Sequence, residues 1–149
     1  MEVKQLSSIY YEEMKQVFVD VFSAEPWNDK WVDDAQVDRY LKDLTDYGNT
    51  LSFVLVDESD TVVGGALGYV SNWWEGREYY IKEFFIKVSE QEKGLGSVFL
   101  KELSEHLKRS DIEYVTLMTD YSVPAFSFYK KNGFKESTDT VFMVRRITE

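Results

Sequence analysis

Cysteine is absent from the 149 residues of this sequence. Its absence excludes disulfide bonds, thiolate metal sites and cysteine nucleophiles. The sequence has only one histidine, which leaves too few imidazole and thiolate ligands for a transition-metal site, so we expect no metal. No apolar run approaches the ~20 residues that cross a bilayer, and the first residues lack the apolar segment of a signal peptide. We therefore expect a cytoplasmic protein that does not bind membranes.

Basic residues are fewer than acidic ones. The sequence has 17 lysines and arginines and 27 aspartates and glutamates, which gives a formal net charge of -10. Such a chain repels phosphate backbones, so nucleic-acid binding is not expected. An acidic surface keeps many proteins soluble, and it also suits a cationic substrate. The net charge alone leaves both interpretations open.

Apolar residues make up 44% of the chain and aromatic residues 16%, which is enough for a packed core. The length is that of one ordinary domain, and no repeat or flexible linker divides it. We therefore expect a single domain over residues 1–149.

The spacing of apolar residues predicts helices and strands along the whole chain. In order, we expect a strand over residues 1–6, a helix that Pro26 ends, a helix over 32–44, strands over 51–56, 61–70 and 79–88, a helix to Lys108, a strand over 114–118, a helix over 125–131 and two closing strands over 134–147. The first helix is expected to bury a stripe from Ile9 to Phe22, and residues 71–76 are expected to form an exposed loop. This order predicts an α/β fold with a mixed sheet and helices on both faces.

A glycine-containing turn separates the most apolar predicted strand from the helix that follows it. The turn has the sequence Gln91-Glu92-Lys93-Gly94-Leu95-Gly96. The first amide N–H groups of a helix have no partner within the helix, and together with the helix dipole they favour a phosphate. Glycine lets the backbone approach such a ligand closely. An ordinary turn before a helix has the same composition, so the turn alone does not decide between the two.

Gln91-x-x-Gly94-x-Gly96 resembles the acetyl-CoA pyrophosphate loop of the GNAT superfamily, which has the pattern Arg/Gln-x-x-Gly-x-Gly/Ala. A second element of that family follows as Ala125-x-x-Phe128-Tyr129-x-Lys131-x-Gly133-Phe134. The predicted order of helices and strands also matches, so the resemblance covers nearly the whole chain. It implies a GNAT-like fold with a mostly antiparallel, twisted central sheet. It also implies an acetyl-CoA-dependent N-acetyltransferase, loosely similar to aminoglycoside N-acetyltransferases.

The resemblance implies acetyl-CoA contacts for particular residues. The main chain of Phe85 and Ile86 is expected to bind the pantetheine arm, and an amide there to polarise the thioester carbonyl. The residues expected at the pyrophosphate are Gln91, Lys93, Gly94, Leu95, Gly96 and Ser97. Lys93 also fits an ordinary surface lysine. Ser122 replaces an asparagine that many members have, so a weaker or water-mediated contact is expected there.

Two residues are candidates for the chemistry. Tyr129 aligns with the tyrosine that protonates the leaving thiolate in the family, although neighbouring phenylalanines also suit it to a core aromatic. Glu83 lies in an apolar predicted strand, on the expected face of Ile81 and Phe85. Burial raises a carboxyl pKa and suits a general base near neutral pH, whereas an ion pair or an exposed edge position would make it structural. The single histidine, His106, fits a half-buried helix residue better than a catalytic one.

Tryptophans and acids occur together in two segments that border the acceptor cleft in the family. Trp27 and Trp31 lie in the first segment, and Trp74 and Glu75 lie in the second. Asp120 follows a predicted strand and adds a carboxylate. Aromatic faces beside carboxylates suit ammonium groups. Tryptophans that anchor loops to the core would give the same pattern.

The expected reaction is direct transfer of an acetyl group from acetyl-CoA, the co-substrate, to a primary amine of a small cationic molecule in a ternary complex. Without cysteine, a cysteine-linked acetyl-enzyme is excluded. The alternatives are a non-catalytic acyl-CoA-binding module and an acetyltransferase that acts on a protein or peptide amine. A homodimer is compatible with the family, in which dimers are frequent. The sequence does not identify the acceptor.

Overall fold

The computed structural model describes residues 1–148 of the chain. Its elements are β1 (Glu2–Gln5), α1 (Ser8–Ser23), α2 (Asp34–Asp43), β2 (Thr50–Val56), β3 (Val62–Trp73), β4 (Gly76–Ile86), the 3-10 helix η1 (Val88–Glu90), α3 (Leu95–Arg109), β5 (Tyr114–Leu117) and α4 (Pro124–Lys131). They fall into two compact units, Met1–Met118 and Thr119–Glu149. The expectation of one domain over residues 1–149 stays a prediction.

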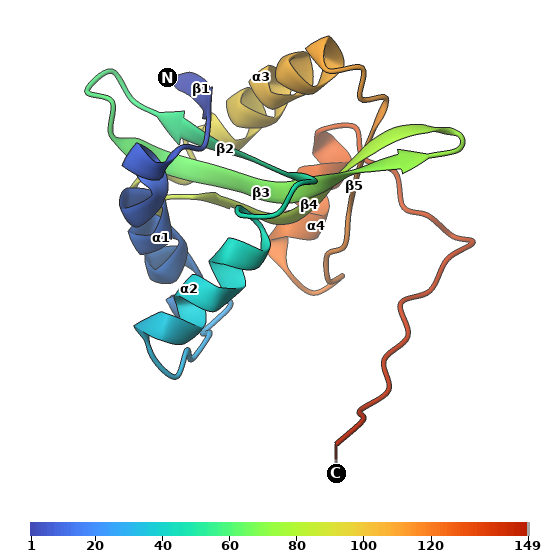
Figure 1. The fold of residues 1–149 in the computed structure, drawn as a ribbon, viewed down its shortest axis with the longest axis horizontal. Helices are drawn as coiled ribbons and strands as arrows, with labels where there is room; N and C mark the ends of the chain where they lie inside the picture. The colour runs from blue at the N-terminus through green and yellow to red at the C-terminus, as the bar shows by residue number, and fades with distance from the viewer. Residues whose placement is uncertain (149) are drawn as a thin grey trace. The chain divides into compact units, whose positions relative to one another are not determined.

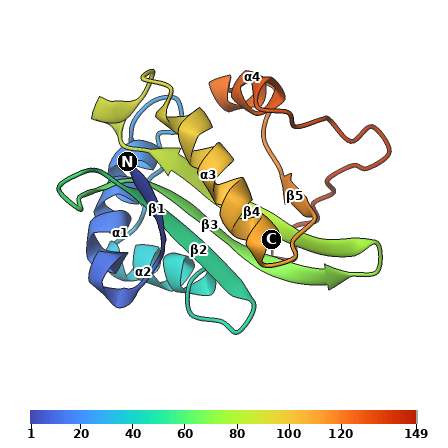
Figure 2. The ribbon, with the colours of Figure 1, turned by 90° about the horizontal axis from the view of Figure 1, so that it is seen from above.

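A five-stranded sheet in the order β1-β2-β3-β4-β5 forms the centre of the first unit. Neighbouring strands are antiparallel except β4 and β5, which are parallel. Helices α1 and α2 cover one face of this sheet and α3 covers the other (Figures 1 and 2). The expected α/β class, with a mostly antiparallel sheet and helices on both faces, is confirmed.

Local sequence explains where α2 begins and how it is fixed to α1. The Asp33 carboxylate accepts a hydrogen bond from the Gln36 amide at 2.8 Å, and the Gln36 side chain accepts one from the Val32 amide at 2.7 Å. Asp33 therefore caps the first turn of α2, and the helix starts two residues later than expected. The Lys15 ammonium of α1, which is almost buried, pairs with Asp34 at 2.8 Å and with Asp38 at 3.0 Å. The ion pairs hold α2 in place against α1.

Some expected elements differ from the structure. Ile9 is 78% exposed, so the buried stripe of α1 does not include it and begins at Tyr10. The expected loop over residues 71–76 is wrong as well. β3 ends at Trp73 and β4 begins at Gly76, so only two residues lie between the strands.

The two closing strands expected over residues 134–147 are also wrong. No strand follows α4 within residues 1–148. Four consecutive apolar residues, Val141 to Val144, are typical of a strand that is buried on both faces. Such a strand forms where other strands and a second layer cover it, and here these four side chains are 70–83% exposed.

Within residues 1–148, no helix has both the length and the apolar character that a bilayer span requires.

Candidate active site

Glu83 lies next to a bulge in β4. The register of β3 and β4 pairs Leu67 with Glu83 but Gly68 with Ile81, so Lys82 is an extra residue on β4. A bulge of this kind bends the strand and changes which face the next side chain meets. It breaks the simple alternation on which the expected face of Glu83 depended.

The contacts on each side of the bulge show the change of face. Before it, Tyr79 packs on Phe53 with ring centroids 6.4 Å apart, and Phe53 contacts His106 of α3 at 5.7 Å. Alternation therefore places Ile81, like Tyr79, on the α3 side. After the bulge, Phe85 packs against Phe18 of α1 at 5.6 Å. The expectation that Ile81 and Glu83 share a face is wrong because Lys82 is inserted between them.

The bulge depends on a glycine in the opposite strand. A Cβ atom at Gly68 would lie 1.9 Å from the carbonyl oxygen of Tyr80. No side chain fits at that distance, so only glycine lets β3 approach β4 here. The Gly64-Gly65 pair serves similar close packing, since a Cβ at Gly65 would lie 2.3 Å from the Phe85 ring.

The Glu83 carboxylate accepts a hydrogen bond from the Tyr40 hydroxyl of α2. Burial raises the pKa of Glu83, and the negative charge of Asp29 adds to this effect. The Tyr40 hydrogen bond and the positive charge of Lys82 act in the opposite direction. The net pKa is raised above the usual value, while the carboxylate is held in a defined orientation. This combination suits a proton acceptor that works near neutral pH.

Tyr40 itself is held by aromatic neighbours. Its ring lies 5.3 Å from that of Trp31 and 6.1 Å from that of Phe18. Burial and the nearby Glu83 charge raise the pKa of Tyr40 far above its usual value, so the phenol remains protonated and donates to Glu83. The sequence analysis did not single out Tyr40. A tyrosine among the aliphatic core positions of a helix is the signal that could have identified it.

Asp29 is the second residue that the sequence analysis left out of the site. The loop after α1 returns toward the helix, because the Asp29 amide donates to the Phe22 carbonyl at 2.8 Å. Partial burial raises the pKa of Asp29. Its carboxylate acts electrostatically on both Glu83 and Tyr40. Two acids from distant parts of the chain thus lie near each other on the α1–α2 side of the sheet.

Trp27 and Trp31 belong to the same aromatic cluster. The Trp27 ring lies 5.5 Å from that of Phe22, and 36% of the residue is exposed. The indole nitrogen Nε1 of Trp31 is buried and has no hydrogen-bond partner among residues 1–148. Since a buried donor without a partner is costly, it is a candidate for binding an acceptor oxygen atom of a ligand.

Trp74 and Glu75 are not brought to Glu83. They form the turn between β3 and β4, and Trp74 is 80% exposed. Glu83 lies about eight residues further along an extended strand, which corresponds to roughly 25 Å. The structure therefore groups Trp27 and Trp31 with Glu83, and places Trp74 and Glu75 at the far end of β4.

β4 continues past the point where its pairing with β5 ends. The last pair is Ile81 with Leu117, and β4 extends to Ile86. The Lys87 amide donates to the Val63 carbonyl of β3 at 2.8 Å, so the backbone of Lys87 faces β3. Because the backbone groups of successive residues face opposite neighbours, the backbone of Phe85 also faces β3 and that of Ile86 faces the other edge. The Ile86 carbonyl there accepts from Gln91 Nε2 at 2.9 Å. Of the two expected pantetheine-binding residues, Ile86 is the one whose backbone is turned to this edge.

The loop between β4 and α3 has the features of a phosphate-binding turn. Gly94 adopts a left-handed conformation with φ of 78° directly before α3, and the space around its missing Cβ is open within 4 Å. The amide of Val98 bonds to the Gly94 carbonyl at 3.2 Å. The preceding amides, from Leu95 to Ser97, belong to the group that has no acceptor within a helix. These amides can bind an anionic group such as a phosphate.

Lys93 is engaged in an ion pair close to this turn. Its ammonium lies 3.2 Å from the Glu90 carboxylate, and both groups are partly exposed. Exposed pairs of this kind are weak, so a phosphate would compete for the lysine at little cost.

Tyr129, Ser122 and Asp120 belong to the second unit. Tyr129 lies in α4, with its ring 5.3 Å from that of Phe128 and 5.4 Å from that of Phe134. Its carbonyl accepts from the Phe134 amide at 3.0 Å. Ser122 and Asp120 are exposed before the start of α4. The aromatic contacts fit a packing role, and they also fix a ring whose hydroxyl can act as an acid.

His106 is half-buried on α3, and its ring contacts Phe53 at 5.7 Å. This agrees with its interpretation as a helix residue on the core side. Among residues 1–148 there is no group of three or more acidic or histidine side chains arranged to hold a metal ion.

Comparison with known proteins gives one family and one fold. Residues 6–134 match the model of the acetyltransferase (GNAT) family. An aminoglycoside acetyltransferase from an uncultured soil metagenomic sample, solved with sisomicin, superposes with a TM-score of 0.76 at 19% identity, over 99% of this chain and 96% of that chain. A probable acetyltransferase superposes with a TM-score of 0.81 at 13% identity, over 100% of this chain and 99% of the other. An aminoglycoside 6′-N-acetyltransferase from Acinetobacter haemolyticus gives 0.73 at 11% identity, over 99% and 100%. At these identities the structures show the fold alone.

Proposed function

We propose that this chain, which belongs to the acetyltransferase (GNAT) family, transfers the acetyl group of acetyl-CoA to a primary amine of a small cationic acceptor. The observation that supports this most directly is the Glu83 carboxylate, which is partly buried, held by Tyr40 and located where β4 extends past its pairing with β5. In a ternary complex, an acceptor amine there lies beside both a base and the strand edge expected to bind the thioester.

The proposed reaction is a direct attack. Glu83 removes a proton from the acceptor ammonium, itself or through a water molecule, and the free amine attacks the thioester carbonyl carbon. A main-chain N–H at the β4 edge stabilises the oxygen on which negative charge develops. The carbon–sulfur bond then breaks, and Tyr129 gives its proton to the leaving thiolate. The nitrogen loses its second proton to solvent as the tetrahedral intermediate collapses. Solvent then reprotonates Tyr129 and takes the proton from Glu83, so that the net products are the acetamide, CoA thiol and one proton.

Acetyl-CoA would be bound by the edge of β4 and the turn after it. The pantetheine arm would lie beside β4 at Ile86, whose backbone is turned to that edge. The pyrophosphate would lie at the start of α3, with Gly94 giving access to the amides of the first turn. Lys93 would move from Glu90 to the phosphate.

The acceptor would be recognised by the cluster around Glu83. Asp29 offers a carboxylate for a second ammonium group, and the rings of Trp27, Trp31 and Tyr40 offer faces for cation–π contact. The buried Trp31 Nε1 offers a donor for an acceptor hydroxyl. Amines that also bear hydroxyl groups fit this set. The relative solved with sisomicin is an aminoglycoside acetyltransferase, and aminoglycosides are therefore the first compounds to test.

The proposal is tested by the release of free CoA thiol with a panel of aminoglycosides, polyamines, amino acids and peptides. Glu83→Gln should lower turnover at neutral pH and leave acetyl-CoA binding nearly unchanged. The deficit should shrink at alkaline pH, where free amine becomes more abundant. Glu78→Gln is the matched control, because Glu78 is another partly buried carboxylate of β4 at a distance from the Tyr40 contact. Equal deficits in the two variants would contradict the base role, and acetyl-CoA binding without turnover on any amine would favour a non-catalytic module.

A further inference from the structure

A side-chain hydrogen bond closes the segment that follows β4. Gln91 comes directly after η1, and its Nε2 atom donates to the Ile86 carbonyl at the end of β4 at 2.9 Å. The main chain between these two residues is itself folded back. The Glu90 amide donates to the Lys87 carbonyl at 2.8 Å, and the Gln91 amide donates to the Val88 carbonyl at 3.3 Å. These bonds direct the Gln91 side chain back to the end of the strand.

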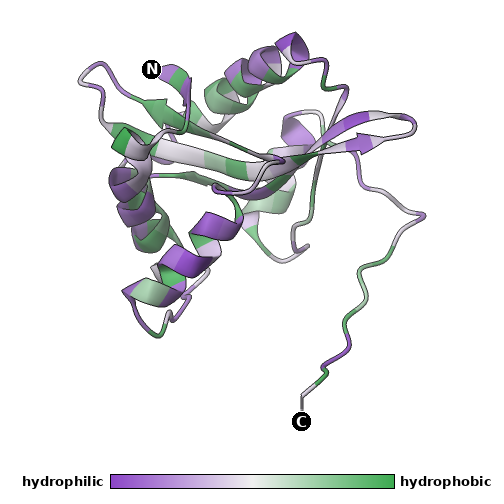
Figure 3. Cartoon of the chain, viewed as in Figure 1, coloured by the Kyte–Doolittle hydropathy of each residue, from purple (hydrophilic) through white to green (hydrophobic). Residues whose placement is uncertain are grey.

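The Ile86 carbonyl needs a hydrogen-bond partner because its surroundings are apolar. Ile86 is 8% exposed, and Figure 3 shows neutral and hydrophobic colouring along the central strands. The carbonyl faces the edge of β4 beyond the last pair with β5, which is Ile81 with Leu117. A buried carbonyl without a partner is costly. Gln91 therefore satisfies this carbonyl in the free protein.

The same carbonyl is the acceptor that acetyl-CoA would use. The proposed function places the pantetheine arm beside β4 at Ile86, and the role of Gln91 rests on that proposal. The pantetheine arm contains two amide groups, and an extended ligand binds a strand edge through hydrogen bonds to its main chain. The side-chain amide of Gln91 and an amide of the arm are donors of the same kind. Each can therefore replace the other at the Ile86 oxygen atom.

We propose that Gln91 is a placeholder for acetyl-CoA. Its side-chain amide binds the Ile86 carbonyl in the free protein, and a pantetheine N–H replaces it there in the complex. The exchange keeps the carbonyl paired in both states and holds the edge of β4 in place before the co-substrate arrives. A preformed edge lowers the ordering cost of binding, whereas breaking the Gln91 bond offsets part of the gain. Gln91 is thus a positioning residue.

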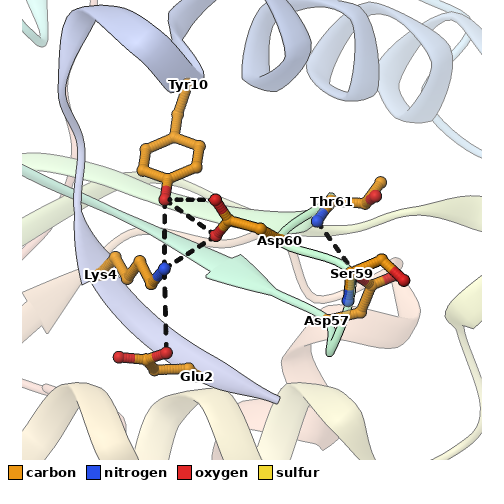
Figure 4. A network of polar contacts seen from close by, with 7 residues as sticks. All are labelled: Glu2, Lys4, Tyr10, Asp57, Ser59, Asp60 and Thr61. Carbon is orange, nitrogen blue, oxygen red and sulfur yellow. Dashed lines mark hydrogen bonds and ion pairs between the residues drawn. The ribbon is translucent and has the colours of Figure 1, made fainter.

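A polar network at β1 has the features of a permanent contact and provides a comparison. Lys4 of β1 donates to the Asp60 carboxylate at 2.8 Å and to the Tyr10 hydroxyl at 3.2 Å, and it lies 3.8 Å from Glu2 (Figure 4). Tyr10 also donates to Asp60 at 2.9 Å. Hydrogen bonds between charged groups are stronger than neutral ones. The Gln91 bond has one neutral donor on an exposed residue, so it is the easier one to exchange.

Chemical denaturation with and without acetyl-CoA tests the exchange. Gln91→Met keeps the length of the side chain and removes the donor, so the free variant should be less stable than the natural chain. At saturating acetyl-CoA the two chains should have the same free energy of unfolding, because the Gln91 bond is then absent from both. By linkage, acetyl-CoA should bind the variant more tightly, by about 2- to 10-fold for one neutral hydrogen bond. Gln91→Ala also lacks the donor and should change the affinity in the same direction.

Two controls distinguish this exchange from a general loosening of the turn. Adenosine 3′-phosphate 5′-diphosphate has the pyrophosphate of CoA and lacks the pantetheine arm, so calorimetry should give it the same affinity for the natural chain and for Gln91→Met. Lys4→Met removes the donor of the β1 network, which acetyl-CoA does not replace. Any loss of stability in this control should therefore be the same with and without acetyl-CoA.

The outcomes separate the placeholder role from the proposed reaction. A stability deficit of Gln91→Met that persists at saturating acetyl-CoA, or weaker binding of acetyl-CoA to this variant, means that the bond is kept in the complex and overturns the placeholder role. Equal affinity of acetyl-CoA for the variant and the natural chain, or an equal gain for the fragment without pantetheine, also overturns it and leaves the transfer reaction intact. A natural chain that does not bind acetyl-CoA overturns both.

Discussion

Removing the Tyr40 hydroxyl should move the pH at which the enzyme becomes active. In the structure this hydroxyl donates to Glu83, and its hydrogen bond lowers a Glu83 pKa that burial has raised. Tyr40→Phe keeps the ring between Trp31 and Phe18 and deletes only the donor. The Glu83 pKa should therefore rise further, because the carboxylate loses a partner that favours its charged form.

The size of the shift follows from the type of bond. A hydrogen bond to a charged group contributes about 1.5–3 kcal/mol, which corresponds to about 1–2 pKa units at 1.36 kcal/mol per unit. Glu83 is only partly buried, so the lower end is expected, about one unit. A base acts when it is deprotonated, so the acidic limb of the kcat profile should move to higher pH. Turnover should fall about tenfold on that limb and recover on the alkaline plateau.

Other groups face Glu83, and the controls separate their effects. They are Lys82 and Tyr80 on β4, Asp29 on the loop after α1 and Tyr40 on α2. Tyr80→Phe is the matched control, since Tyr80 interacts with Glu83 only electrostatically, and its profile should stay near that of the natural enzyme. In a Glu83→Gln background, Tyr40→Phe should have no further effect on the profile. A kcat that falls equally at every pH, with an unmoved acidic limb, would refute this role of Tyr40.

Three further substitutions test other parts of the structure. Gly94→Asp should weaken acetyl-CoA binding at least tenfold, or about 1.4 kcal/mol, because it adds negative charge beside the pyrophosphate. Calorimetry measures the affinity. Gly94→Ala is the control, since it imposes the same strained φ of 78° without the charge. Tyr129→Phe should reduce turnover by ~10²–10⁴-fold with the fold intact by circular dichroism, and full activity would reduce Tyr129 to a packing residue. Gly68→Ala should destabilise the fold by about 1–3 kcal/mol in chemical denaturation, because its Cβ would lie 1.9 Å from the Tyr80 carbonyl oxygen; an unchanged midpoint would contradict the close approach at the bulge.

Local signals in the sequence predicted much of this architecture. The turn from Gln91 to Gly96 lies between a strand and a helix, as the sequence predicts, because glycine and helix-start preferences act over a few residues. Glu83 lies in a strand, as the sequence also predicts, because the apolar and aromatic residues around it favour a strand locally. Its face could not be predicted, because the bulge at Lys82 depends on the approach of Gly68 from another strand. Long-range packing of this kind leaves no periodic signal.

The residues that the sequence analysis missed also depend on long-range contacts. In the sequence, Tyr40 has the spacing of an ordinary core residue of α2. Only the fold shows that its hydroxyl donates to Glu83, which is 43 residues away. The two closing strands expected over residues 134–147 show the opposite error. The strand propensity of this segment is a local property, and it does not show whether a strand edge is there to pair with.

The acids near the tryptophans differ in whether they have partners within the fold. This difference indicates which carboxylate would attract a cationic acceptor. Asp33 caps α2 through the Gln36 amide and Asp34 pairs with Lys15, so both have partners within the fold. Asp29 has no cationic partner among residues 1–148, and partial burial raises its pKa. A cation supplied by the acceptor would therefore gain more from Asp29 than from the others.

Asp29→Asn should raise the acceptor KM and reduce the dependence of this KM on salt, because salt screens contacts between exposed charges over ~8 Å. Asp34→Asn, which leaves Lys15 its second partner Asp38, should leave both unchanged. Equal responses in the two variants would show that the overall charge of the protein, and not a placed carboxylate, attracts the acceptor.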